Sequence, residues 1–317
     1  MKFPDKGSLL DLGKGSVATL TLFLAYVTFP LVGMLPGLFA PFPAIYYALK
    51  RDRPTGTAIV AVSALVLAFL GDPTVVLLYL LQCGVISLAL PVFLARGKGG
   101  ARSIAYTVAV SLGVVLLLAG IYCAVRGVNL HLQVQKGIQS SIAQTASLYE
   151  KAGIKGDDLK EYQQGMEEAG KLIGRIYPSL VVVTLAFIAG FNLLLLRRSA
   201  ARFPVPLALG DFVRFKNPEQ LVWVLIGAGF TMLVPNQLAT TAALNVLVVT
   251  VSLYFIQGMA VIAHFFARMA TPRFVRVIFY CVLALQPYLT VAVAALGIFD
   301  IWGDFRTPRP PKQQENL

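Results

Sequence analysis

The sequence predicts an all-α fold, a polytopic transmembrane helical bundle of about nine spans with an extracytoplasmic helical hairpin. Of the 317 residues, 57% are hydrophobic and only 13% are charged, whereas soluble domains average about 25% charged residues. Most of the apolar runs are roughly 17–28 residues long and do not alternate with polar residues, which favours membrane-spanning helices over a barrel. Because lipid offers no hydrogen bonds, each run must pair its backbone groups within a helix.

The clearest of these runs is 240–267, which contains no Asp, Glu, Lys or Arg. At ~1.5 Å per residue it exceeds a ~30 Å hydrocarbon core. Taken in chain order, the predicted spans are 16–32, 38–49, 55–70, 75–94, 104–125, 178–196, 219–234, 240–267 and 274–299. Pro287 is a candidate bend in the last one.

The region 126–175 is polar and carries both signs of charge. Apolar residues recur at helical spacing on both sides of Gly153 and Gly156, which predicts two helices packed against each other outside the membrane. The expected organisation is therefore helices 1–5 in 1–125, the hairpin in 126–175, helices 6–9 in 176–305 and a disordered tail in 306–317.

Lys and Arg cluster in the short segments between spans, and this positive-inside pattern places the N-terminus in the cytoplasm. We expect a multi-pass protein of the bacterial inner membrane. Nine spans leave the tail outside with Arg306, Arg309 and Lys312, against the charge rule. If the tail is cytoplasmic, one span is miscounted, within 16–49 or at 219–234.

The net charge of +12 does not indicate nucleic-acid binding, because the cations lie between apolar runs and form no single patch. The sequence holds no Walker A motif and no nucleophile–base pair, so we expect no enzyme. Cys83, Cys123 and Cys281 lie singly in apolar runs and the two histidines have no companion at metal-binding spacing. We therefore predict no metal site and no cofactor.

Neutral amides are the polar groups that remain inside the spans. Two interpretations stay open: they are hydrogen-bonding links between helices, or several of them line a cavity that holds a small neutral ligand. The candidate ligand-binding residues are Gln82, Asn192, Asn245, Gln257 and Gln286.

The last span ends in a mixed aromatic and charged cluster. Trp302 suits the aromatic belt of a membrane, and Asp300, Asp304 and Arg306 are placed to pair with one another or with a neighbouring helix. We interpret these four residues as a structural anchor.

Three motifs carry a resemblance to a known family. The stretch YFIQGMAVI at 254–262, PRF at 272–274 and GIFDIWGDFR at 297–306 resemble the end of the YybS-like family of predicted bacterial membrane proteins, and the likeness runs over nearly the whole chain. That family is thought to be remotely similar to the substrate-binding S-components of energy-coupling-factor (ECF) transporters. The resemblance implies capture of a small molecule for transport, although this chain has more spans and an added hairpin.

Two functions are consistent with the sequence. The first is a non-catalytic binding protein like an S-component, with an amide-lined pocket for a small neutral ligand. The alternative is a membrane scaffold that recruits membrane or envelope proteins through the outer hairpin and the loop 199–218. The lipid bilayer is a partner in both.

Overall fold

A computed structural model describes residues 6–151, 153, 157–204 and 207–306, and the described chain is helical, as predicted. It divides into two compact units. The N-terminal unit comprises Met1–Tyr177 and Val181–Gly210, and the C-terminal unit comprises Pro178–Leu180 and Asp211–Leu317. Almost all of the predicted tail lies outside the described residues; only Arg306 belongs to them.

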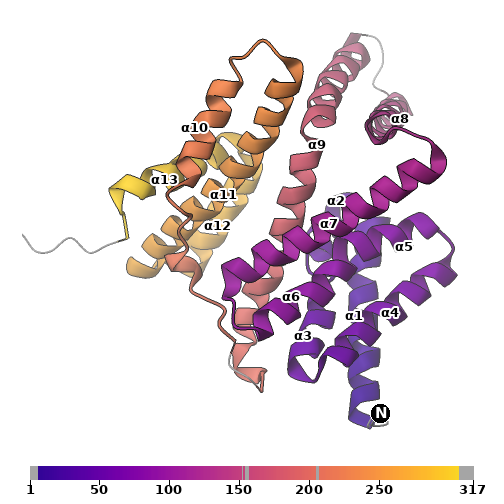
Figure 1. Ribbon diagram of the computed structural model, residues 1–317, viewed down its shortest axis with the longest axis vertical. Coiled ribbons are helices and arrows are strands. Elements are labelled where there is room, and N and C mark those ends of the chain that lie inside the picture. Colours follow the sequence, from indigo (N-terminus) through magenta and orange to yellow (C-terminus); the bar gives the residue numbers. More distant parts are fainter. Residues whose placement is uncertain (1–5, 152, 154–156, 205–206, 307–317) are drawn as a thin grey trace, which may run out of the picture. The chain divides into compact units, whose positions relative to one another are not determined.

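The helices follow one another with short connections (Figure 1). In the N-terminal unit they are α1 (Lys6–Thr28), α2 (Pro30–Gly37), α3 (Phe42–Lys50), α4 (Arg53–Leu70), α5 (Pro73–Tyr79), the π-helix η1 (Leu80–Gly84), α6 (Val85–Ala95), α7 (Gly100–Arg126), α8 (Leu130–Lys151) and α9 (Asp157–Arg198). Two 3₁₀ turns, η2 (Ala200–Arg202) and η3 (Phe212–Arg214), lead to α10 (Leu221–Thr231), α11 (Gln237–Arg268), α12 (Arg273–Leu285) and α13 (Pro287–Gly303).

Acidic and amide side chains fix several helix starts. The Asp52, Asp72 and Asn236 side chains accept hydrogen bonds from the first backbone N–H groups of α4, α5 and α11, respectively, groups that have no partner within their own helix. At the other end of α4, Gly71 adopts a φ of 116°, a conformation that favours glycine. Short polar segments at these positions separate the long apolar helices.

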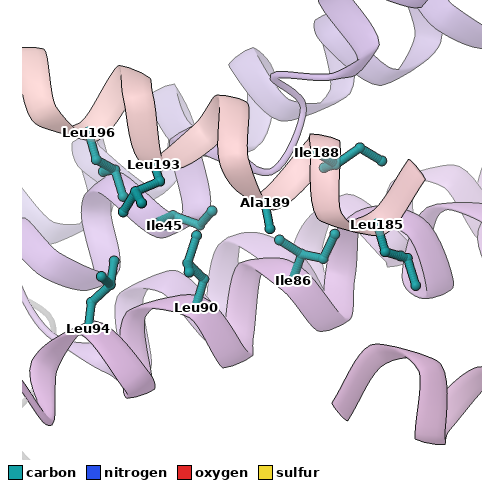
Figure 2. Packing of buried hydrophobic residues seen from close by; sticks show 9 residues of the cluster. All are labelled: Ile45, Ile86, Leu90, Leu94, Leu185, Ile188, Ala189, Leu193 and Leu196. Atoms are coloured by element: carbon teal, nitrogen blue, oxygen red, sulfur yellow. The ribbon is translucent and has the colours of Figure 1, made fainter. Parts of the chain in front are cut away.

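Two apolar clusters form the core of the N-terminal unit. Figure 2 shows the first, in which the side chains of α6 point toward those of α9, with Ile45 of α3 between them. The second packs α1 and α4 around Phe23 and Tyr79, whose ring centroids lie 5.2 Å apart.

The predicted hairpin consists of α8 and the first half of α9. A Cβ at Gly170 of α9 would lie 2.7 Å from Ile142 Cδ1 of α8, so the two helices pack against each other as predicted. Helix α9 runs without a break into the predicted sixth span. Helix α8 is not continuous with the fifth span, because the chain turns at Gly127 with a φ of 62°.

In the C-terminal unit, α10 and α11 lie side by side and are joined by a turn (Figure 1). Helix α13 crosses α11 where two glycines meet it. A Cβ at Gly258 would overlap the carbonyl oxygen of Val293, and one at Gly297 would overlap that of Tyr254. The backbones therefore approach more closely than any other residue would allow.

The number of spanning helices differs from the expected nine. Seven described helices are long and apolar enough to cross a membrane, or eight if the bent pair α12–α13 is one span. Eight differs from nine at 219–234, where the α-helix covers only the 11 residues of α10, and seven differs from nine at 274–299 as well. The sequence is uncharged throughout 221–234, but Pro235 and the turns before it end the helix early.

Candidate functional site

The most elaborate polar arrangement in the C-terminal unit centres on Gln257, in the second half of α11. Its side chain is fully buried. Its Oε1 accepts a hydrogen bond of 2.9 Å from the backbone N–H of Asn217, and its Nε2 donates one of 2.9 Å to Oδ2 of Asp300. Gln257 thus links the loop before α10 to the end of α13.

Asp300 also forms an ion pair with Arg306, and the two side chains are 1% and 11% exposed. Arg306 donates two further hydrogen bonds, to the carbonyl oxygens of Val213 (3.0 Å) and Phe215 (2.8 Å). Oδ1 of Asp300 is buried without a hydrogen-bond partner among the described residues. A charge pair as buried as this one is held mainly by its additional hydrogen bonds.

Local backbone features bring these groups together. The glycine contact between Gly258 and α13 brings α13 against the helix turn that carries Gln257. After α13 the chain reverses at Asp304, which adopts a φ of 36°, and so returns Arg306 toward Asp300. Asn217 is fixed in turn, because its Nδ2 donates to the carbonyl oxygen of Leu253 at 2.9 Å.

Two other predicted amides bond to protein groups. Asn192, in α9, donates to the carbonyl oxygens of Leu38 (2.8 Å) and Ile188 (2.7 Å). Asn245, in α11, accepts from the backbone N–H of Ser179 (2.9 Å) and donates to Thr241. Each amide joins two segments that are distant in sequence, as expected of a hydrogen-bonding link between helices.

The remaining two amides lie elsewhere. Gln82 sits in η1, partly buried, and its Oε1 has no hydrogen-bond partner among the described residues. Gln286 is exposed at the break between α12 and α13. The five amides are thus divided between the two units, and the structure brings only Gln257 together with residues of the predicted anchor.

Within that anchor, Asp300 and Arg306 pair, whereas Trp302 is 66% exposed at the end of α13. An exposed indole at a helix end is typical of the membrane interface. Asp304 forms the reversing turn.

Sequence reasoning missed Asn217 and the carbonyl oxygens of Val213 and Phe215. Asn217 is only 6% exposed, although it belongs to a polar loop that looks solvated in the sequence. A signal is present at 212–216, where aromatic and cationic residues alternate, because this pattern is typical of a segment at a membrane face.

A second set of buried polar groups, also missed, lies in the N-terminal unit. The hydroxyls of Thr19, Ser63 and Tyr79 are buried, and none has a hydrogen-bond partner that meets ordinary geometry among the described residues. Ser63 of α4 lies beside Tyr79 of α5, next to the π-helix that carries Gln82. Single π-turns inside α-helices occur frequently at functional sites.

The distal end of the hairpin carries a third feature. The rings of Tyr149 (α8) and Tyr162 (α9) stack with centroids 5.3 Å apart and an interplanar angle of 9°. Both remain substantially exposed, at 37% and 52%, and the adjacent Leu148 is 63% exposed. The described part of the chain contains no group of three or more His, Cys, Asp or Glu that could hold a metal ion.

Comparisons with known proteins agree with this membrane architecture. Residues 17–301 match the model of a family described as "Predicted membrane protein (DUF2232)". The chain is 22% identical to the uncharacterized protein YybS of Bacillus subtilis (strain 168) over 289 residues, which are 90% of this chain and 92% of the relative. No solved structure matches the chain. With nearly its whole length covered by the family model, the chain belongs to the DUF2232 family of predicted membrane proteins, and it is a multi-pass membrane protein.

Proposed function

We propose that this protein is a non-catalytic membrane scaffold that binds a partner protein through the distal end of the α8–α9 hairpin. The observation that carries the proposal is the exposed aromatic pair Tyr149–Tyr162 with Leu148 beside it. Five candidate spans precede the hairpin, so with a cytoplasmic N-terminus the partner lies on the outer side.

The tyrosine pair is suited to binding and is not needed to hold the hairpin together. Nearer the membrane, Ile138 and Ile142 already pack against Gly170. The stacked rings fix each other's orientation, so little side-chain freedom is lost when a partner covers them. Tyrosine is enriched among the residues that dominate protein–protein binding energy.

The surroundings of the pair favour a protein partner over lipid. Charged side chains of both signs flank it, namely Glu150, Lys151, Asp157, Lys160 and Glu161. An apolar centre within a charged rim is the usual composition of a protein interface.

The arrangement of the amides supports the scaffold over an amide-lined pocket. Asn245 and Gln257 use both ends of their carboxamides in hydrogen bonds to protein groups, and Asn192 uses its Nδ2. A ligand would have to replace those bonds, and each exchange would lower its affinity.

Binding of a small neutral molecule, as in an S-component, remains a second candidate. It is favoured by the buried hydroxyls of Thr19, Ser63 and Tyr79, which have no hydrogen-bond partner of ordinary geometry among the described residues, and by the Oε1 of Gln82, which has none either. Such groups are stabilised when a ligand or ordered water supplies the missing hydrogen bonds.

Native mass spectrometry on protein extracted gently from its own host membrane tests both functions. For the scaffold, we expect co-extracted proteins whose amount falls about tenfold or more when Tyr149 and Tyr162 are both replaced by Ser. Tyr122→Ser is the matched control, because Tyr122 lies on α7 and is 50% exposed. Equal loss in the control, or unchanged association in the double variant, would contradict the proposal.

The same spectra report on the small-molecule alternative. A defined extra mass that disappears in Tyr79→Phe and persists in Tyr149→Ser/Tyr162→Ser would favour ligand binding in the N-terminal unit. An extra mass that instead disappears in Gln257→Leu would favour ligand binding in an amide-lined pocket that includes Gln257.

A further inference from the structure

The contacts of the loop before α10 with α11 indicate how deep in the membrane that loop lies. Asn217 bonds to Leu253 and Gln257, and Gln257 comes 20 residues after Gln237, the first residue of α11. At 1.5 Å per residue that distance is ~30 Å, the thickness of a hydrocarbon core. Asn217 and the turn before Gln237 therefore lie on opposite faces of the membrane, and the segment 217–236 crosses it despite its short helix.

The end of α13 lies at the same depth as Asn217. Asp300 bonds to the Gln257 side chain, and Arg306 bonds to the carbonyl oxygens of Val213 and Phe215. The clasp formed by Gln257, Asp300 and Arg306 thus fixes the C-terminal end of α13 to the face on which the loop 211–217 lies.

The start of α12 lies on that same face. Helix α11 continues 11 residues beyond Gln257 to Arg268, and α12 packs against its last turns. Arg276 donates to the carbonyl oxygen of Phe266, and the rings of Phe279 and Tyr280 lie 5.4 Å and 6.2 Å from the Phe266 ring.

We infer that α12 and α13 form a re-entrant hairpin, which begins and ends on one face of the membrane and does not cross it. The 109° bend at Gln286 reverses the chain, and the backbone approach of α13 to Tyr254 and Gly258 keeps it at the depth of the second half of α11.

Helix α12 packs against α11 beyond Gln257, so on the same scale of depth it lies in the interface of a single leaflet. Its side chains are exposed on several sides and apolar, including Phe274 (73%), Val277 (57%) and Leu285 (78%). Arg273 and Arg276 lie at its beginning, where headgroups are near. Trp302, 66% exposed at the end of α13, fits the same interface.

With α12 and α13 forming such a hairpin, the C-terminus lies on the side of the loop 211–217. Six candidate spans precede the loop 211–217, an even number, so this loop and the C-terminus lie on the same side as the N-terminus. Arg306, Arg309 and Lys312 then join the other loop cations on the cytoplasmic side, in agreement with the charge rule. The miscounted span is 274–299, while 219–234 does cross.

Thiol labelling of the full chain tests the inference. Cys123 and Cys281 are replaced by Ala, Cys83 is buried, and single cysteines are introduced by Arg214→Cys, Met269→Cys, Gln313→Cys and Gln237→Cys. The probe is a membrane-impermeant maleimide applied to right-side-out and inside-out membrane vesicles. We expect positions 214, 269 and 313 to react in the inside-out vesicles, and position 237 in the right-side-out vesicles.

Either of two results would overturn the inference. Labelling of position 313 together with position 237 would show that α12–α13 crosses the membrane. Labelling of position 214 together with position 237 would show that 217–236 does not. Full-length chains with green fluorescent protein or alkaline phosphatase after Leu317 provide a second measurement without internal substitutions. We expect fluorescence and no phosphatase activity. The reverse result, in a chain whose position 214 reacts in the inside-out vesicles, would exclude the hairpin.

Discussion

At the scale of single residues, Gln257 connects three segments of the C-terminal unit with one carboxamide. Replacing Gln257 with Leu leaves the backbone N–H of Asn217 and one hydrogen bond of Asp300 without partners. We expect this change to lower the free energy of unfolding by about 2–4 kcal/mol, because each buried polar group left unpaired costs about 1–3 kcal/mol. Thermal unfolding in a single detergent measures the effect.

Gln286→Leu is the matched control, since Gln286 is also an amide in an apolar stretch but is exposed. Its effect should stay within about 0.5 kcal/mol. Equal destabilisation by both changes would show that the Gln257 hydrogen bonds contribute little.

The ion pair of Asp300 and Arg306 gives a second prediction. Asp300→Asn or Arg306→Gln alone leaves one buried charge uncompensated, which typically costs about 3–5 kcal/mol. The double variant carries two neutral groups and should recover much of that loss. A double-mutant cycle of unfolding free energies measures the coupling, and additive losses would mean that the two charges do not stabilise each other.

Residue types predicted part of this network. Gln257, Asp300 and Arg306 stood out because polar groups near the middle or end of an apolar run need partners. Their partners were not readable, because Asn217 contacts Gln257 through its backbone and lies 40 positions away. Gln286 looked equivalent to Gln257 in the sequence. In the structure Gln257 is buried, whereas Gln286 is exposed because it lies at the bend between α12 and α13.

At the scale of helices, the crossing of α11 and α13 depends on its two glycines. Gly258→Ala or Gly297→Ala would place a methyl group against a backbone carbonyl, which cannot move as a side chain can. We expect each to destabilise the protein by about 1–3 kcal/mol. Gly227→Ala and Gly229→Ala in α10 are the controls, since open space surrounds both, and they should be neutral or gain up to about 1 kcal/mol. Tolerance of Ala at 258 and 297 would contradict the close crossing.

The N-terminus of α4 carries a pH-dependent contribution. Asp52 accepts hydrogen bonds from the backbone N–H and hydroxyl of Thr55, and these bonds lower the pKa of Asp52 below its usual value. A depressed pKa means that the stabilisation is present above the ordinary carboxyl pKa and is lost as pH falls through the lowered one. Asp52→Ala should cost about 1 kcal/mol at neutral pH.

Asp52→Ser distinguishes the cap from the charge. The Ser hydroxyl can cap the helix without titrating, so stability should remain close to that of the parent while its acid-dependent loss becomes smaller. Unfolding measured between neutral pH and pH 3 for the three proteins checks both statements. Parallel acid profiles for Asp52→Ser and the parent would exclude Asp52 as the titrating group.

Hydropathy predicted most helices, because a run of about 20 apolar residues has few alternatives in a membrane. It predicted 219–234 as a span, in agreement with the inferred crossing of 217–236, although the α-helix there, α10, has only 11 residues. It failed at one segment, where the length of a span does not mean a crossing. The segment 274–299 has the length of a span, but the break at Gln286 divides it.

At the scale of the whole chain, the two units differ in how polar groups are used. In the C-terminal unit, buried polar side chains are linked from the loop 211–217 through α11 to Arg306. In the N-terminal unit, more of the buried side-chain oxygens lack a partner among the described residues than in the C-terminal unit, where Tyr254 Oη and Asp300 Oδ1 do so. Composition could not reveal this division, because both halves are equally apolar runs with scattered Ser, Thr, Asn and Gln.

The division predicts that the clasp belongs to the C-terminal unit alone. Asn217, Gln257, Asp300 and Arg306 all lie within 211–317, so a fragment with these residues contains every hydrogen bond of the network. We expect Arg306→Gln to lower the melting temperature of the membrane-inserted fragment about as much as that of the full chain, whereas truncation after Arg306 should change neither. If the substitution affected only the full chain, the clasp would depend on residues 1–210, and the boundary at 210 would not separate independent structural units.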